Sequence, residues 1–204
     1  DTDRLAIFMT QTGGCCRASN YIGFIRRALD KAGYSHIPVI SLSMSGLEKN
    51  QGFKPTVALV KEAVYAILYG DLIMRCLYRV RPYELTEGSA NELRDTLIRR
   101  CISSLTDKKS KTGFREMCDT IVRSFDTLPI HEEMVKPRVG IVGEILVKYM
   151  PLANNHLVDL LEREGAEAVV PDLIDFMNYC MLNARYKRKY YGKSKGLVVA
   201  SDAV

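Results

Sequence analysis

Two segments near opposite ends of the sequence each show a strand–helix–strand pattern, and this repeated arrangement constrains the fold more than any other feature. In the first, apolar runs at residues 5–9 and 37–42 flank a segment in which Ser19 or Asn20 caps a helix that continues to Ala32. Two strands joined in this way pair in parallel through a right-handed crossover. The sequence therefore predicts a βαβ unit near the N-terminus.

The second pattern lies in the C-terminal third of the chain. Residues 138–142 and 168–170 are expected to form strands, and residues 154–164 between them have apolar side chains at helical spacing. A long final helix is predicted from Leu173 to about Tyr191. These segments together predict a second βαβ unit followed by a helix.

Three amphipathic helices are predicted between the two βαβ units, where the sequence shows no convincing strand. They cover residues 56–77, 91–105 and 114–125, in which apolar residues recur close to every 3.6 positions. Residues 128–137 contain two prolines and are interpreted as a linker that leads back to the sheet.

The expected fold class is α/β, with a Rossmann- or flavodoxin-like parallel sheet built from the two βαβ units. A helical insertion over approximately residues 56–127 separates the units. The expected organisation is a single α/β domain over residues 1–204, and the alternative is a split into two domains near Pro129.

Composition and charge limit the classes of function. The 204 residues carry 29 Lys and Arg against 24 Asp and Glu, and the net charge of +5 favours solubility in a chain of this size. No apolar run approaches the roughly 20 residues that span a bilayer, and the first residues do not resemble a secretory signal. We therefore expect no membrane partner and a cytoplasmic location. The chain also lacks an initiator Met, and we expect it to be part of a longer protein.

Six cysteines are scattered along the sequence without the short, regular spacings of a disulfide framework. Reduced thiols are therefore expected. Cys76, Cys101 and Cys118 lie among apolar residues of the predicted helices, so we predict that all three are buried structural thiols.

A basic segment from Arg185 to Lys195 also contains three tyrosines. It is either the solvated face of the final helix with its tyrosines packed inward, or an anion-binding patch for nucleotide, coenzyme A phosphates or nucleic acid. No nucleic-acid-binding motif is found elsewhere, so nucleic acid is not an expected partner.

The most informative candidate site follows the first expected strand. Ligands of open α/β sheets bind at the carboxyl ends of the strands, and glycines there let the backbone approach a ligand closely. Cys16 lies just before a helix N-terminus, where the helix dipole favours the thiolate. Such a thiolate suits an iron ligand or a nucleophile, although the same residues also suit a tight strand-to-helix turn. The predicted anion-binding residues of this segment are Gly13, Gly14, Arg17, Ser19 and Asn20.

Further candidates follow the strands of the second βαβ unit. Glu144 and Asn154 are expected at the same sheet edge as ligand-binding residues. Cys180 is the second candidate metal ligand, with a core helix cysteine as the alternative. Local spacing does not supply the four cysteines of an iron–sulfur cluster, so other ligands must come from distant residues, another domain or another chain. No Ser/His/Asp pattern indicates a catalytic residue.

Residues 11–21, Gln-Thr-Gly-Gly-Cys-Cys-Arg-Ala-Ser-Asn-Tyr, resemble the Gly-x-Cys-Arg…Tyr segment of the acyl-CoA dehydratase activase-related proteins. This family is related to the 2-hydroxyglutaryl-CoA dehydratase activator and to the dehydratase subunits. Residues 38–48 and 140–167 resemble further segments of the same family, so the likeness covers nearly the whole chain in order. Cys16 matches the cysteine that precedes the arginine, whereas Cys15 stands where the family has glycine.

This resemblance implies anaerobic metabolism and iron–sulfur chemistry. In such systems an ATP-driven activator passes an electron to a dehydratase that carries a 4Fe–4S cluster and removes water from a 2-hydroxyacyl-CoA. It implies that Cys16, and less directly Cys180, are cluster ligands, and that partners are other domains of the parent chain or activator and dehydratase subunits. The alternative is a scaffold without metal that binds coenzyme A or a partner domain. The ATPase domain of the family is not in this chain, so the chain alone is not expected to hydrolyse ATP.

Overall fold

The computed structural model describes residues 2–11, 17–43 and 56–192. The chain divides into two compact units, an N-terminal unit of residues 1–56 and a C-terminal unit of residues 57–204. The boundary between them coincides with the predicted start of the helical insertion and lies well before Pro129. None of the described helices is long and apolar enough to cross a membrane.

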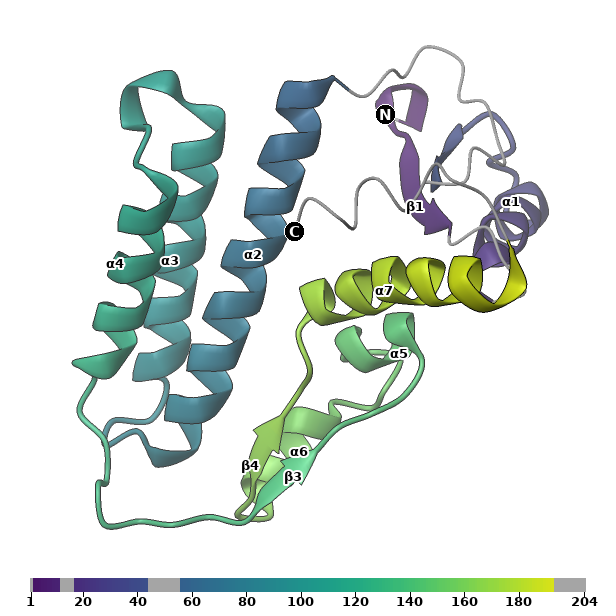
Figure 1. Ribbon diagram of the computed structural model, residues 1–204. Coiled ribbons are helices and arrows are strands. Elements are labelled where there is room, and N and C mark those ends of the chain that lie inside the picture. The colour runs from purple at the N-terminus through teal and green to yellow at the C-terminus, as the bar shows by residue number, and fades with distance from the viewer. Residues whose placement is uncertain (1, 12–16, 44–55, 193–204) are drawn as a thin grey trace. The chain divides into compact units, whose positions relative to one another are not determined.

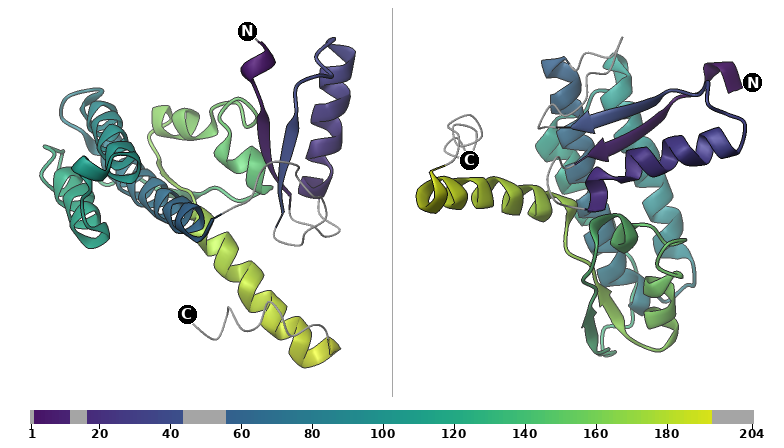
Figure 2. Two further views of the ribbon diagram at one scale, coloured as in Figure 1. Left: turned by 90° about the horizontal axis from the view of Figure 1, so that it is seen from above. Right: turned by 90° about the vertical axis from the view of Figure 1, so that its right-hand side faces the viewer.

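The N-terminal unit contains the first predicted βαβ motif. Strand β1 (Ile7–Gln11) pairs in parallel with β2 (Val39–Ser43), in a register that sets Ile7 beside Val39 and Gln11 beside Ser43. Helix α1 (Tyr21–Lys31) lies alongside the two strands (Figure 2). The short helices η1 (Thr2–Arg4) and η2 (Arg17–Ser19) precede β1 and α1.

Packing in this unit explains where α1 begins and ends. Ile22 and Ala18 are buried, and so is Ile37 just before β2, so one side of the helix covers the strands. Gly33 follows the helix with φ of +81°, a left-handed conformation that glycine adopts without steric cost. The predicted helix stop at this glycine is therefore confirmed.

The predicted helical insertion is a three-helix bundle in the C-terminal unit (Figure 1). Its helices are α2 (Val57–Val80), α3 (Ser89–Thr106) and α4 (Phe114–Asp126), linked by the short helices η3 (Arg81–Tyr83) and η4 (Lys108–Ser110). The three helices bury one cluster of side chains: Tyr69, Ile73, Leu77, Ala90, Leu97, Cys101, Met117, Ile121 and Phe125. Each predicted helix is present, with ends within three residues of those expected.

The turn between α2 and α3 is fixed by Glu84. Its carboxylate accepts hydrogen bonds from the main-chain N–H groups of Gly88 (2.8 Å) and Ala90 (2.7 Å) and from the Ser89 hydroxyl (3.1 Å). The N–H of Ala90 belongs to the first turn of α3 and has no partner inside the helix, and Gly88 is the N-cap residue before it. Glu84 also forms an antiparallel bridge with Ile130, so the linker after α4 is held against the same turn.

The second βαβ motif follows the bundle. Strand β3 (Arg138–Gly140) pairs in parallel with β4 (Glu167–Val169), and helix α6 (Leu157–Arg163) connects them. The final helix α7 runs from Leu173 to Tyr191, as predicted. An additional short helix, α5 (Ile145–Tyr149), stands where the sequence indicated only a loop.

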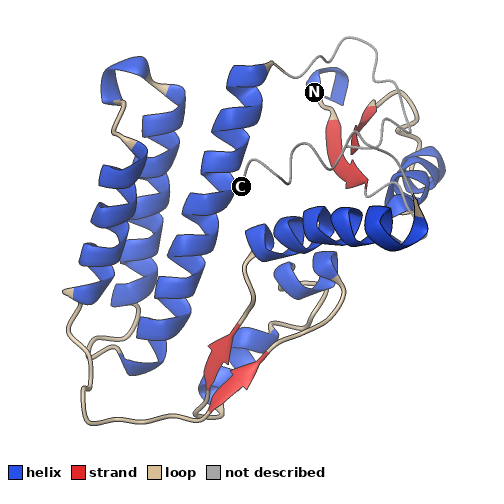
Figure 3. Cartoon of the chain, in the orientation of Figure 1, coloured by secondary structure: helices blue, strands red, loops and turns tan. Residues whose placement is uncertain are grey.

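The strands form two separate parallel pairs within the described residues, β1 with β2 and β3 with β4 (Figure 3). A mixed α/β fold with parallel strands is therefore confirmed. The chain is mostly helical, and hydrogen bonds between the described strands do not join the pairs into the one expected sheet.

A polar stripe along α2 binds the second βαβ motif to the bundle. Asp71, Arg75 and Arg79 are spaced four residues apart and therefore lie on one face of the helix. Asp71 accepts hydrogen bonds from the first two N–H groups of α7, on Leu173 (2.9 Å) and Ile174 (2.8 Å). In this way a carboxylate from α2 caps the N-terminus of a helix about 100 residues further along the chain.

The two arginines of the stripe reach one carboxylate in β4 and one that follows it. Arg75 pairs with Asp172, and Arg79 donates to Glu167 at 2.6 Å. Burial raises the pKa of Asp172, and the charges of Asp71 and Asp175 add to the rise against the opposing effect of Arg75. Each group of the stripe thus makes a polar contact with the segment that contains β4 and the start of α7.

Candidate functional site

The segment that the sequence singled out lies between β1 and η2. Gly13, Gly14, Cys15 and Cys16 are outside the described residues, so only the flanks of this segment can be placed. On one side is Gln11 at the carboxyl end of β1, and on the other is Arg17, the first residue of η2.

Gln11 organises these flanks through two side-chain hydrogen bonds. Its Oε1 accepts a hydrogen bond from the Ser41 hydroxyl on β2 (2.9 Å), and its Nε2 donates to the main-chain carbonyl of Ser19 (2.9 Å). Ser41 is buried, with only 2% of its surface exposed. One side chain therefore ties the carboxyl ends of both strands to the start of α1.

The predicted anion-binding residues at this helix start have different environments. Arg17 is exposed, and Asn20 occupies the N-cap position of α1 without a side-chain cap hydrogen bond. Ser19 is half-buried and contributes its carbonyl to the Gln11 contact. The guanidinium of Arg17 and the N-terminal end of α1 both favour a negatively charged group here.

Cys180 lies in α7, in the C-terminal unit, and is exposed. The described ranges contain no group of three or more His, Cys, Asp or Glu side chains arranged to hold a metal ion. Because Cys16 falls outside those ranges, the structure does not test whether the two cysteines act together.

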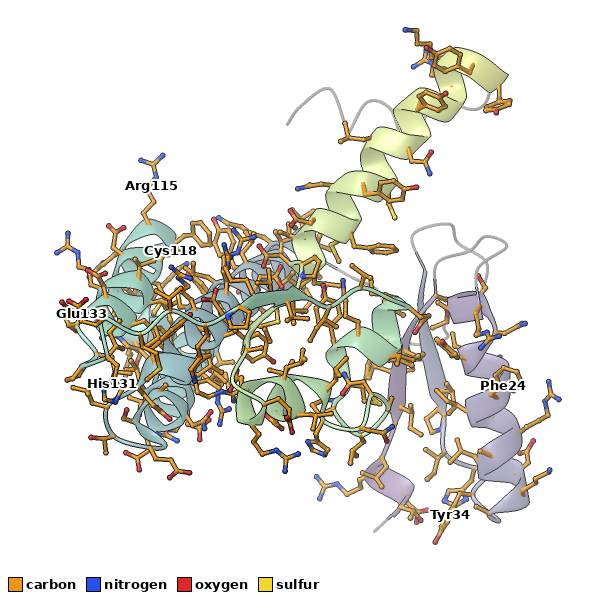
Figure 4. All side chains as sticks on the ribbon, turned by 90° about the horizontal axis from the view of Figure 1, so that it is seen from below. Phe24, Tyr34, Arg115, Cys118, His131 and Glu133 are labelled. Carbon is orange, nitrogen blue, oxygen red and sulfur yellow. The ribbon has the colours of Figure 1, made fainter. Side chains whose placement is uncertain are left out.

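Burial raises the pKa values of the Cys76, Cys101 and Cys118 thiols, so each remains protonated more firmly than an exposed thiol. Cys101 is buried in the bundle, as predicted, while Cys76 and Cys118 are half-buried. Figure 4 shows Cys118 on α4, one turn from Arg115, whose side chain extends away from the bundle. These environments suit structural thiols better than metal ligands or nucleophiles.

Glu144 is the N-cap residue of α5. Its Oε2 accepts a hydrogen bond from the N–H of Val147 at 3.0 Å, which explains why a helix starts here. Its Oε1 is buried and has no hydrogen-bond partner among the described residues.

Asn154 holds α5 and α6 together. Its amide nitrogen donates to the carbonyls of Val147 (3.0 Å) and Lys148 (3.1 Å), and its amide oxygen accepts from the N–H of Leu157 (3.2 Å). The predicted helix from residue 154 therefore begins only at Leu157, because Asn154 uses its side chain to cap the helix.

A cavity of about 320 Å³ lies in the C-terminal unit, and sequence reasoning did not find it. Its floor is one face of α2, formed by Gly70, Ile73, Met74, Leu77 and Tyr78, which recur at helical spacing, and Arg81 in η3 extends this floor. Arg94 and Ile98 come from α3, and Lys148 and Tyr149 come from α5. His156 and Asp159, at the start of α6, complete the polar part of the wall.

The charges around the cavity are unequally neutralised. Arg81 donates to Glu162 at 2.7 and 3.0 Å and to Asp159 at 3.3 Å, so its charge is balanced. Arg94 donates through Nε to Asp95 (2.8 Å) and through Nη1 to Asn91 (3.0 Å).

Lys148 is different, because no carboxylate among the described residues lies within salt-bridge distance of it. Its ammonium group lies 4.6 Å from the centre of the Tyr149 ring.

Tyr149 separates the cavity from the acidic contacts at the start of α7. Its hydroxyl donates to the carbonyl of Pro171. Burial, together with the negative charges of Asp71, Asp172 and Asp175, raises its pKa to about 12. The phenol therefore stays neutral at physiological pH and acts as a hydrogen-bond donor, not as a base.

Comparisons of the chain with protein-family models, with curated proteins and with solved structures found no match. Proposals for its function therefore rest on its own residues and their geometry, and on the motif resemblance described above.

Proposed function

We propose that this chain is a domain of a 2-hydroxyacyl-CoA dehydratase activator-like iron–sulfur protein, in which it supports cluster binding or electron transfer during acyl-CoA dehydration. The motif around Cys16 carries the proposal, since it is the part of the sequence that most resembles the family. The strand and helix that flank this motif give it local support. Parallel strands with a helix N-terminus beside their carboxyl ends are a common setting for bound cofactors and anions.

In this proposal Cys16 is a ligand of a 4Fe–4S cluster and Cys180 is the second, weaker candidate. Other domains of a longer parent chain, or activator and dehydratase subunits, supply the remaining ligands. The two βαβ motifs belong to one Rossmann-like sheet in the assembled protein. Arg17 contributes a positive charge that favours the anionic thiolate.

A second candidate function is a scaffold that binds the phosphates of coenzyme A without a metal. The exposed Arg17 and the N-terminal end of α1 favour it, because both attract phosphate oxygens. The first function predicts bound iron, and the second predicts binding of coenzyme A by protein that contains no iron.

Iron and acid-labile sulfide after anaerobic reconstitution separate the two candidates. When the domains or subunits that supply the remaining ligands are present, we expect a stoichiometric cluster with the unmodified chain, its loss in Cys16→Ser and its retention in Cys118→Ser. Cys118 is a suitable control because the same change is made at a half-buried thiol on α4. Absence of iron, both in this chain and in the longer parent protein, would overturn the cluster proposal. Titration with coenzyme A would then test the scaffold, with Arg17→Gln expected to weaken binding.

A further inference from the structure

We propose that the cavity in the C-terminal unit binds a small carboxylate with an apolar chain. Lys148 and Arg94 contact the carboxylate, and the α2 floor holds the apolar chain. All of these residues belong to the C-terminal unit, and the site is independent of the proposed iron–sulfur function.

The size and floor of the cavity define the apolar part of the ligand. Its 320 Å³ corresponds to roughly ten water molecules at the density of the liquid, which places it at the small end of ligand-binding pockets. Ile73 and Leu77 from α2, Ile98 from α3 and Val170 after β4 line the cavity with aliphatic surface. An apolar ligand chain that displaces water from this aliphatic surface lowers the free energy.

The cationic side chains define the other end of the ligand. Three guanidinium or ammonium groups, from Arg81, Arg94 and Lys148, line the cavity against a single carboxylate, Asp159. Arg81 is already paired with Glu162 and Asp159. Arg94 pairs with Asp95 through Nε and donates to Asn91 through Nη1, whereas Lys148 has no carboxylate partner among the described residues. One carboxylate group on a ligand can accept hydrogen bonds from both Lys148 and Arg94.

The main chain at Lys148 is fixed before any ligand binds. Asn154 donates to the carbonyls of Val147 and Lys148, and Glu144 caps the other end of the same short helix. The side chain of Lys148 therefore extends from a backbone that does not have to become ordered on binding.

Gly70 gives the proposal a direct steric test. It lies inside α2 and lines the cavity, and a Cβ atom added to it would meet nothing within 4 Å. The Cβ of a new side chain is therefore free of contacts, and replacing glycine in a helix interior also improves helix propensity. Gly70→Phe is expected to fill the cavity without unfolding the unit. Gly70→Ala is the milder variant should the phenyl ring prove too large.

The experiment uses the full chain with labelled isoleucine methyl groups and hexanoate as the probe. Methyl signals of Ile73 and Ile98 report on the cavity, while those of Ile25 and Ile37, in the N-terminal unit, serve as internal controls. We expect saturable shifts at Ile73 and Ile98 only, with a Kd of about 1 mM.

Two variants with matched controls test the contacts. Lys148→Met is expected to raise the Kd about tenfold, since it removes a charge-assisted hydrogen bond. Lys61→Met should leave it unchanged. Lys61 is a fair control, because its ammonium also lies over a tyrosine ring, 5.5 Å from Tyr65, but does not line the cavity. Gly70→Phe is expected to abolish the shifts, and Gly23→Phe, on α1, to leave them intact.

Neutral and inorganic probes decide the ligand class. Hexanamide should bind more weakly than hexanoate, and inorganic phosphate should produce no saturable shift at Ile73. Equal binding of hexanamide, equal binding of phosphate, or hexanoate shifts that persist in both Gly70→Phe and Lys148→Met would each overturn the proposal. If Gly70→Phe has a collapsed spectrum, Gly70→Ala takes its place and should weaken hexanoate binding.

Discussion

Replacement of Glu167 by Gln tests the polar contacts that join the second βαβ motif to the helical bundle. Only 2% of the Glu167 surface is exposed. Its Oε2 accepts hydrogen bonds from Arg79 Nη1 (2.6 Å) and the Tyr83 hydroxyl (2.9 Å), and its Oε1 accepts one from Arg138 Nε (2.9 Å). Glutamine keeps the size of the side chain but removes the charge and turns one acceptor into a donor.

The expected cost follows from the burial of each partner. Removing one member of a buried ion pair typically costs about 3–5 kcal/mol. Here the side chains of Arg79 and Arg138 are 62% and 63% exposed, so both guanidinium groups regain water after the change. We therefore expect Glu167→Gln to lower the free energy of unfolding by about 2 kcal/mol, equivalent to about 4–8 °C in Tm.

The effect should depend on pH with a defined sign. Burial alone would raise the pKa of Glu167, but hydrogen bonds from Arg79 and Tyr83 and the charges of Arg79 and Arg138 lower it below its ordinary value. A carboxyl with a lowered pKa in the folded state stabilises the fold above its unfolded pKa of about 4.3. The difference between the unmodified protein and Glu167→Gln should therefore be complete at neutral pH and shrink as the pH falls below about 4.

Urea unfolding followed by far-UV circular dichroism measures this difference. Of the α-helices among the described residues, only α1 lies outside the C-terminal unit, so the helical signal reports mainly on the unit that contains Glu167. Glu164→Gln is the matched control, because it makes the same change at an exposed neighbour and should cost less than about 0.5 kcal/mol. Equal effects of the two substitutions, or a difference that grows as the pH falls, would refute the reasoning.

Three further predictions concern single contacts. Asp71→Asn should destabilise the C-terminal unit by about 1–2 kcal/mol, because it weakens the cap of α7, and faster amide hydrogen exchange at Leu173 and Ile174 would show this. Gly33→Ala should cost about 1 kcal/mol in thermal unfolding, since a φ of +81° strains alanine. Under limiting iodoacetamide, mass spectrometry should find alkylation at the exposed Cys180 well before the buried Cys101, and the reverse order would contradict the described burial.

Periodicity and glycine signals predicted the large elements well. The final helix was predicted from Leu173 to about Tyr191 and has those limits, because Gly192 adopts a left-handed conformation directly after it. The helices of the bundle were also found, since each buries a stripe with regular spacing. The limits of a helix and its buried stripe depend on residues that are close together in the sequence, so a single sequence is enough to predict them.

Features that depend on distant contacts were missed. Helix α5 has only five residues, too few to show a helical period, and it forms because Glu144 caps one end and Asn154 binds the other. The cavity depends on how α2 packs against α5 and α6, which periodicity does not reveal. Asp71 and Glu167 are buried only because their partners come from other parts of the unit, whereas charged residues are normally expected at the surface.

The polar stripe of α2 also has a consequence for the order of folding. Its partners lie 88 to 103 residues further along the chain, whereas α2, α3 and α4 are consecutive and pack on one another. Local contacts form early, and closing a long loop is slow. During synthesis from the N-terminus, the bundle can assemble while Asp71, Arg75 and Arg79 still face water. The unit is complete only after residues 167–174 have been synthesised. A truncated chain that ends after α4 should therefore expose a charged helix face without its partners, which chaperones can bind and proteases can attack.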